Sequence, residues 1–253
     1  MPHVPQDLLD RLAALEREVR QLRGRAQIRP AMNQVLNGDT VIGEGGRLIV
    51  RDPDGTPTFE TGESPGIGDY YTIIRRDTGA VAVAVGNNSY AGDDAPAQMV
   101  RLFDRAGHPI VMDDYHADGW LGRPMLPVPW QPTGATVDHT GALATAWYAY
   151  FRAQNPVLYL RTQSATTAAS ATVRLDLFNL TKGTGYQNID SWTIGAGPPT
   201  LHPVTFPLHG VEYFDEVQLR IQHSTPGTGL VTTDVLGCTG RNTFSASEVP
   251  TPP

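Results

Sequence analysis

The feature that most constrains this chain is a short run of regularly spaced apolar residues near its N-terminus. Between residues 7 and 25, the apolar positions follow one another at spacings of 4, 3, 4 and 3, as Leu8, Leu12, Leu15, Val19 and Leu22. This spacing is the heptad pattern of a coiled coil, and it is narrower than the stripe of a helix that packs on a globular core. The sequence therefore predicts a coiled-coil helix, with Leu12 and Val19 at heptad position a.

The charged residues beside this seam favour a parallel homo-oligomer. Arg11 and Glu18 fall at g positions, and Glu16 and Arg23 fall at the e positions that follow, so both interchain pairs join opposite charges. Residues 11 to 16, Arg-Leu-Ala-Ala-Leu-Glu, also resemble a short motif of three-stranded coiled coils, in which the Arg fork binds a neighbouring chain's Glu. We predict a trimer interface of Leu8, Arg11, Leu12, Leu15, Glu16, Glu18, Val19, Leu22 and Arg23.

An ordinary amphipathic helix packed on its own domain stays open as the alternative. The seam spans only about two and a half heptads, fewer than the three to four that identify a coiled coil securely. At 1.5 Å per residue the helix would be about 28 Å long and marginal by itself. A trimer would therefore need further contacts elsewhere in the chain.

Three segments after the helix predict β-hairpins of one kind. Residues 49–60, 73–85 and 100–112 each place apolar residues on both sides of a turn that pairs an Asp with a Gly, at Gly55, Gly79 and Gly107. Asp caps its own backbone in such turns, and Gly supplies the positive φ that closes them. A single hairpin is barely stable in water, so these units need one another or copies on other chains. The alternative is one small monomeric β-domain.

The C-terminal half predicts an antiparallel sandwich with a jelly-roll-like arrangement of six to eight strands. Apolar and polar residues alternate within residues 143–151, 157–163, 171–180, 189–194, 211–221 and 230–236, and turn sequences separate these runs. The preceding segment, residues 117–134, is too rich in Pro for a strand and is predicted to run extended along a surface. The expected organisation is a coiled-coil helix (1–25), linker (26–46), β-hairpin repeats (47–116), Pro/Trp-rich linker (117–134), β-sandwich (135–248) and tail (249–253).

Composition and charge argue against several functions. The chain has 26 Gly and 21 Pro among 253 residues, which favours many short strands over helices, and its net charge of −7 without a basic cluster disfavours nucleic acid as a partner. The single cysteine allows neither an intrachain disulfide nor a thiolate zinc site. Neither a signal peptide nor a membrane span is expected, since no apolar run approaches 18 residues.

No enzyme motif or cofactor site stands out. The Walker, zinc-protease and serine-hydrolase motifs are absent from the sequence, so we expect a protein that is not an enzyme and holds no cofactor or metal. Asp113, Asp114 and Asp118 are the sharpest candidate ion ligands, but a solvated turn is the preferred interpretation because the cluster lacks the Gly and distal Glu of a calcium loop. Acidic pairs for glycan cleavage are equally unspecific, and Asp215 and Glu216 are interpreted as turn residues.

Exposed aromatic residues give the better route to a ligand, because Tyr and Trp offer a flat apolar face with a polar tip that suits sugars. Alternation along residues 147–151 places Tyr148 and Tyr150 on one face and Trp147, Ala149 and Phe151 on the other. We expect the tyrosine face to be accessible. The predicted glycan contacts are Tyr148, Tyr150, Trp120 and Trp130, although packing between modules is the commoner use of the two Trp rings.

The layout of the chain resembles the minor tail and tail-fibre proteins of long-tailed phages of actinobacteria. The resemblance lies in the Arg-rich heptads, in a hairpin unit such as Val-Arg-Asp-Pro-Asp-Gly at residues 50–55, and in a closing module with Trp-Tyr-Ala-Tyr at 147–150 and Asn-Pro-Val-Leu-Tyr-Leu-Arg at 155–161. It implies a trimeric tail-tip or fibre component that resides in the virion, contacts other tail or baseplate proteins, and takes part in binding host-surface glycan. The alternatives are a glycan-degrading enzyme on the same scaffold and a monomeric carbohydrate-binding accessory protein.

Overall fold

The structure is a computed structural model that describes residues 6–27, 39–64, 69–87, 98–133, 137–138, 141–226 and 228–252. The chain divides into two units, residues 1–43 and 44–253. The described residues form one helix and antiparallel sheets, which confirms the predicted mainly β class. None of the described helices is long and apolar enough to cross a membrane.

The first unit contains helix α1, Gln6–Gln27, which covers the predicted heptad segment. Side chains are described for residues 10–21, so Leu8, Leu22 and Arg23 lie outside the described side chains. Within the described part, Leu12, Leu15 and Val19 are 56%, 59% and 46% exposed. Three large apolar side chains, spaced as the sequence predicted, are thus about half exposed on this helix.

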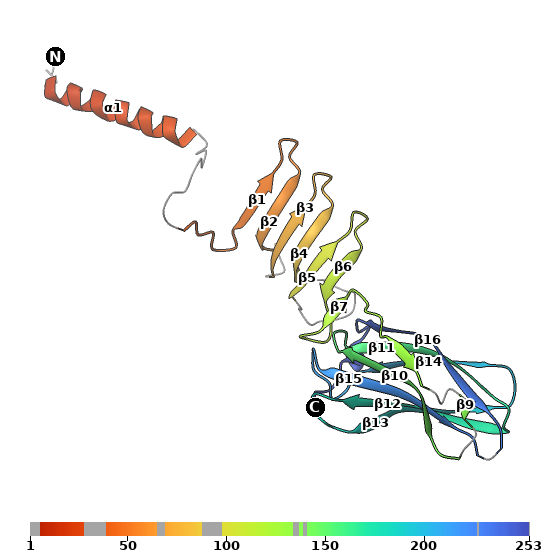
Figure 1. Cartoon of the computed structure of the whole chain (residues 1–253). Helices are drawn as coiled ribbons and strands as arrows, with labels where there is room; N and C mark the ends of the chain where they lie inside the picture. Colours follow the sequence, from red (N-terminus) through yellow and green to blue (C-terminus); the bar gives the residue numbers. More distant parts are fainter. Residues whose placement is uncertain are drawn as a thin grey trace. The chain divides into compact units, whose positions relative to one another are not determined.

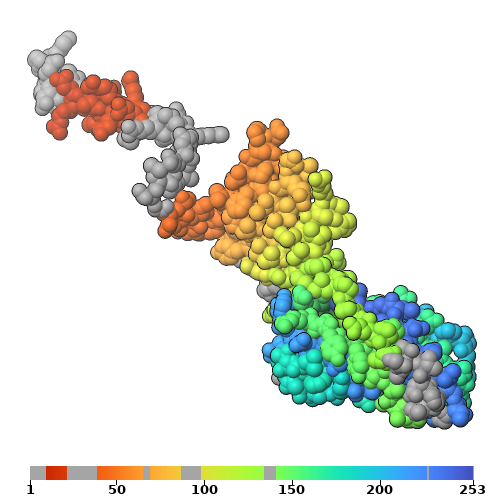
Figure 2. Space-filling model, in the orientation of Figure 1, coloured from red at the N-terminus to blue at the C-terminus, as the bar shows by residue number. Residues whose placement is uncertain are grey.

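The second unit begins with a seven-stranded antiparallel meander in which each strand pairs with the next along the chain (Figure 1). In the space-filling view the colours run in order from orange to yellow-green across this sheet (Figure 2). Its strands are β1 (Arg47–Arg51), β2 (Pro57–Glu63), β3 (Tyr70–Arg75), β4 (Val81–Asn87), β5 (Gln98–Phe103), β6 (Pro109–Asp113) and β7 (Leu121–Arg123).

The three Asp–Gly turns close the hairpins β1–β2, β3–β4 and β5–β6. Asp104 shows the chemistry most fully, because its Oδ1 accepts hydrogen bonds from the backbone N–H groups of Ala106 and His108. Gly107 follows with a φ of +90°, a value that favours glycine. Each hairpin also carries a register shift beside its turn, as between Val50 and Arg51, so one extra residue is accommodated there.

The Pro/Trp-rich segment departs from the sequence prediction. We expected no strand between residues 117 and 134, but Leu121–Arg123 forms β7 and Trp130–Pro132 forms β8. Both are three-residue strands at the edge of their sheets, where a proline removes no hydrogen bond that a neighbour needs. The segment therefore joins the two β regions by adding an edge strand to each.

Two further sheets share one core at the C-terminal end, and we call them the two-sheet module (Figure 1). One sheet has the order β13-β12-β15-β10-β8 and the other β14-β11-β16-β9. The remaining strands are β9 (Val137–Asp138), β10 (Ala144–Arg152), β11 (Val157–Thr166), β12 (Ser170–Asn179), β13 (Tyr186–Gly195), β14 (Thr200–Pro207), β15 (Glu216–Ser224) and β16 (Val231–Arg241), followed by the 3-10 helix η1 (Ala246–Glu248).

The core of this module is made by the inward residues that alternation identified. Leu175 and Leu219 from the five-stranded sheet and Leu158 and Leu160 from the four-stranded sheet are at most 1% exposed. Each such side chain contributes about 1.5–3 kcal/mol on burial. Strand β14 was missed by the sequence analysis, and the run predicted from residue 211 begins as a strand only at Glu216.

Candidate functional site

The outer face of the five-stranded sheet carries a group of aromatic side chains. Tyr150 is 51% exposed, Tyr148 is half-buried beside it, and their ring centroids lie 6.2 Å apart. Trp147, Ala149 and Phe151 point to the other side, where they belong to or pack against the core. The predicted alternation is therefore observed, and the tyrosine side of β10 is accessible to solvent.

A buried glutamine connects these tyrosines to the next strands. The Nε2 of Gln218 on β15 donates to the Tyr150 hydroxyl, and its Oε1 accepts from the Tyr186 hydroxyl at 2.6 Å. The Tyr186 ring in turn lies 5.2 Å from Phe178, centroid to centroid. Burial raises the pKa of Tyr186, so this phenol remains a hydrogen-bond donor at neutral pH. The hydroxyls of two tyrosines are thus held in place by a single amide.

A charge cluster completes the face around Asp176, whose side chain is completely buried. Its carboxylate accepts hydrogen bonds from Arg174 Nε at 2.5 Å and from Arg220 Nε at 2.9 Å, and Asn188 Nδ2 lies 3.3 Å from it. The Arg220 guanidinium also stacks on Tyr186, 3.4 Å from the ring centroid. A register shift between Leu175 and Asp176 on the β12–β13 pair lies at this cluster.

Together these residues form a surface of rings and fixed hydrogen-bonding groups, which we call the tyrosine face: Tyr148, Tyr150, Phe178, Tyr186, Gln218 and Arg220. Alternation in the sequence had already separated Phe178, Gln218 and Arg220 from the inward residues of their strands. These three residues lie close to Tyr150 only because β15 lies between β12 and β10 in the sheet. No local sequence pattern predicts that strand order. The side of the sheet on which these residues lie was therefore predictable, but their clustering was not.

The two tryptophans predicted as glycan contacts lie apart from the tyrosine face. Trp120 and Trp130 are partly buried and pack against the core of the two-sheet module, and Trp120 also contacts Tyr213 edge to face. Both rings therefore have a packing role, on the core of one module and not between modules as the alternative had it. A role for Tyr148 and Tyr150 in binding glycan stays a prediction.

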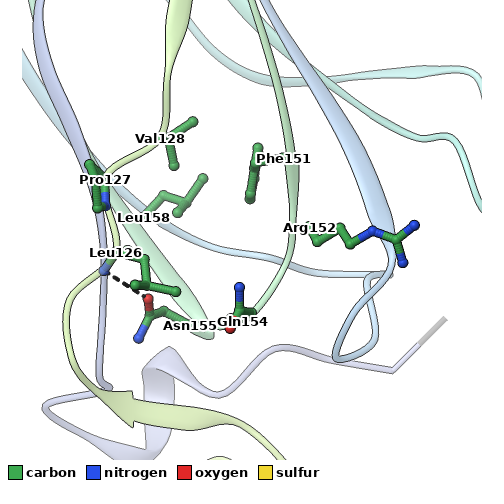
Figure 3. A pocket seen from close by; sticks show the side chains of 9 residues that line it. Leu126, Pro127, Val128, Phe151, Arg152, Gln154, Asn155 and Leu158 are labelled. Carbon is green, nitrogen blue, oxygen red and sulfur yellow. Dashed lines mark hydrogen bonds between the residues drawn. The ribbon is translucent and has the colours of Figure 1, made fainter.

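A pocket of about 260 Å³ lies where the segment before β8 meets the ends of β10 and β11 (Figure 3). Leu126, Val128, Phe151 and Leu158 give it an apolar wall, and Arg152 is the one charged side chain among its lining residues. Asn155 holds the wall together, because its Oδ1 accepts from the Leu126 N–H at 3.2 Å. The volume is at the lower end for a ligand site, and the lining offers no acid–base pair.

The acidic residues singled out by sequence have structural partners. Asp114 is 4% exposed, and its carboxylate accepts the backbone N–H of Ala117 at 2.9 Å and both the N–H and the hydroxyl of Thr243. The expected solvated turn is therefore wrong for Asp114, because this residue anchors the end of β16 across 129 positions of sequence. Asp113 accepts the Val100 N–H, and Asp215 caps the N–H of Glu212 as a turn residue should.

Within the described part of the chain, no three His, Cys, Asp or Glu side chains are grouped so as to hold a metal ion. Of the residues predicted to form the trimer interface, the apolar side chains that the structure describes, Leu12, Leu15 and Val19, lie exposed on α1. Glu16, predicted to pair between chains, lies 3.9 Å from Arg20 of the same helix, an exposed ion pair of little strength. The interface itself stays a prediction.

Comparisons with known proteins add little. No family model and no curated protein matches the sequence. Among solved structures, the Eiger TNF of S. frugiperda is 9% identical, with a TM-score of 0.29, over 49% of this chain and 97% of that one. A structure of infectious bursal disease virus, Gx strain, is 14% identical with a TM-score of 0.30, over 73% of this chain and 45% of that one. The VP2 subviral particle of that virus is 13% identical with a TM-score of 0.29, over 71% of this chain and 45% of that one.

The chain spans less than half the length of these two viral proteins. TM-scores of 0.29 to 0.30 do not establish a shared fold. The description of the two-sheet module rests on its strand pairing and core alone.

Proposed function

We propose that the protein is a homotrimeric structural component of a virion, located in the tail tip or tail fibre of an actinobacterial phage, and that it takes part in attachment to host-surface glycan. In this proposal it is a binding protein without catalytic activity. Its N-terminal helix forms a parallel coiled coil, the hairpins form repeats behind it, and the two-sheet module is a jelly-roll-like sandwich. Other tail or baseplate proteins are its further partners.

The observation that carries the proposal is the exposed seam of α1. Leu12, Leu15 and Val19 are each about half in water, although a helix of 22 residues is marginal without tertiary packing. Burying these three side chains between copies removes apolar surface that a lone chain exposes. In a parallel arrangement both interchain pairs, Arg11 with Glu16 and Glu18 with Arg23, join opposite charges, as a parallel homo-oligomer needs.

The tyrosine face supports the attachment part of the proposal. Sugars bind well to aromatic rings that carry hydrogen-bonding tips, and here the Tyr150 and Tyr186 hydroxyls are fixed through Gln218. Three copies of a weak face in one particle bind a repetitive glycan far more tightly than one copy does. The layout shared with tail-fibre proteins supports placing this avidity at the tip of a phage tail.

Light scattering of the full chain tests the proposal. We expect three times the chain mass of 27.4 kDa for the unchanged protein and a lower mass at the same dilution for Leu12→Asp combined with Leu15→Asp. Ala13→Asp with Gln21→Asp is the matched control, because it places two acidic residues on α1 away from the seam.

The proposal is supported if the control variant has the mass of three chains while the variant with Leu12→Asp and Leu15→Asp has a lower mass. A monomeric unchanged chain overturns it and favours the monomeric accessory protein instead. Release of reducing sugar from cell-wall polysaccharide by the trimer would favour the glycan-degrading alternative.

A further inference from the structure

The sheet β1–β7 has one face that is apolar from strand to strand. Paired residues lie on the same face of an antiparallel sheet. One row of paired residues therefore crosses six strands. Its successive pairs are Val50–Phe59, Phe59–Ile74, Ile74–Val83, Val83–Leu102 and Leu102–Val111. Every member of this row is apolar: Val50, Phe59, Ile74, Val83, Leu102 and Val111.

A second row runs beside the first on the same face. It contains Leu48, Val85 and Val100, with Thr61 and Thr72 between them, whose hydroxyl groups are 2.8 Å apart and hydrogen-bonded to each other. We call the two rows the apolar stripe. With strands about 4.8 Å apart, the stripe is roughly 24 Å long and two residues wide.

The opposite face of the sheet has a different composition. One row there mixes the charged residues Glu60, Arg101 and Arg123 with the apolar residues Ile49, Ile73, Ala84 and Met112. Glu60 is held by hydrogen bonds from Tyr71 and Arg47. Long Arg side chains on such a face cover neighbouring apolar atoms while keeping their charge in water. This face therefore carries charged groups among its apolar residues, whereas the members of the stripe are all uncharged.

The stripe is exposed in the single chain. Val50, Ile74, Val100 and Val111 are 47%, 42%, 45% and 39% exposed, and Leu48 and Leu102 are similar at 44% and 37%. In the described part of residues 44–253, no second sheet packs on this face. These six side chains leave on the order of 400 Å² of contiguous apolar surface in water, as large as the largest patches on typical monomers.

The geometry points to a contact between copies of this chain: the apolar stripe faces the stripes of two further copies, so that three sheets enclose one apolar interior. The number of copies rests on the proposed trimer. The narrow width of the stripe fits this arrangement, because three sheets that meet around an axis each present a strip, whereas a broad two-layer packing needs a wider apolar face. The charged faces of all three sheets then point outward.

A copy of the chain fits the stripe better than an unrelated partner does. The members of its two rows are uncharged, so the stripe offers no specificity for a partner of particular charge, whereas every further copy of the chain carries an apolar stripe of the same length and width. Chains that α1 already holds together also present their stripes to one another at high effective concentration.

Cysteine cross-linking of the full chain tests the inference. Leu48→Cys on β1 and Leu102→Cys on β5 place a thiol at two points along the stripe, and a trifunctional maleimide can join three such thiols. Arg47→Cys is the matched control, because it is the exposed neighbour of Leu48 and points to the opposite face. The native Cys238 is 5% exposed, and burial raises its pKa to about 11, so it contributes little background.

We expect covalent trimers as the main product for Leu48→Cys and Leu102→Cys. Arg47→Cys should react with a monofunctional maleimide and yet form no covalent trimer. If light scattering shows three chains but neither stripe variant cross-links, the stripe inference is overturned and the proposed trimer stands. If the unchanged chain is a monomer, both fail together.

Discussion

Replacing Asp176, which lies beside the tyrosine face, by Asn should destabilise the two-sheet module. The Asp176 carboxylate is fully buried and accepts hydrogen bonds from the guanidinium groups of Arg174 and Arg220, whose side chains are 33% and 21% exposed. The substitution keeps the size of the side chain but removes the charge that both arginines neutralise. It also leaves the two guanidinium groups facing each other.

The size of the expected stability loss depends on how deeply Asp176 and its two arginine partners are buried. Removing one member of a fully buried ion pair costs about 3–5 kcal/mol. Because both arginines keep part of their side chains in water, which screens the uncompensated charge, we expect a loss of about 2–3 kcal/mol in the free energy of unfolding. The same change should loosen Arg220 from the Tyr186 ring, on which it now stacks.

Urea unfolding followed by tryptophan fluorescence measures this loss, at one fixed protein concentration because association also contributes to stability. Asp190→Asn is the matched control. Asp190 lies on β13 of the same sheet and pairs with His202 at 2.8 Å, but its side chain is 30% exposed, so its loss should cost less than about 1 kcal/mol. Equal shifts for the two variants, or a shift below about 0.5 kcal/mol for Asp176→Asn, would refute the reasoning.

Two further predictions concern ligand binding and pH. Tyr150→Ala should weaken retention on immobilised actinobacterial cell-wall polysaccharide at a temperature where the variant is folded, and it should also lower the unfolding midpoint, because the buried Gln218 amide loses this acceptor; equal retention of the variant and the unchanged protein would count against the tyrosine face. Glu248 accepts two hydrogen bonds from Arg241, at 2.8 and 2.6 Å, and this holds the pKa of its carboxyl below the ordinary value. Because the pKa of this carboxyl is lower in the folded protein than in the unfolded chain, its ion pair stabilises the fold at pH values above the unfolded pKa of about 4.3. This stabilisation is lost as the pH falls through the pKa of the folded state. Glu248→Gln should therefore lower the thermal midpoint by about 2–4 °C at pH 7 and by little at pH 3; a pH-independent difference would contradict the ion-pair explanation.

The parts of the fold that could be read from sequence are those where one local pattern decides the structure. Alternation placed β10, β12 and β15 and their inward residues, because a strand buried on one face must repeat every two residues. Strand β14 was missed because Pro203 and Pro207 argue against a strand, yet β14 lies at a sheet edge, where proline is tolerated. Local composition does not say which strand will lie at an edge.

Contacts between distant segments were not predictable in the same way. Asp114 sits in what reads as a polar turn, and only its contact with Thr243 makes it a buried anchor. The tyrosine face likewise needs β15 to lie between β12 and β10, an order set by packing of the whole module. The apolar stripe depends on register shifts beside each turn, since a slip of one residue would move its members to the charged face.

In the proposed trimer, the helix seam and the apolar stripe are two small contacts that act together. In that proposed trimer, the helix contact rests on three half-exposed side chains of a helix about 33 Å long, and the sheet contact rests on an exposed stripe two residues wide, so each contact is weak by itself. Neither surface is large enough to hold three chains firmly alone, but chains joined at one surface meet at the other without a further loss of translational freedom. Such coupling lets a protein remain soluble as a newly made chain and yet assemble firmly once three chains meet.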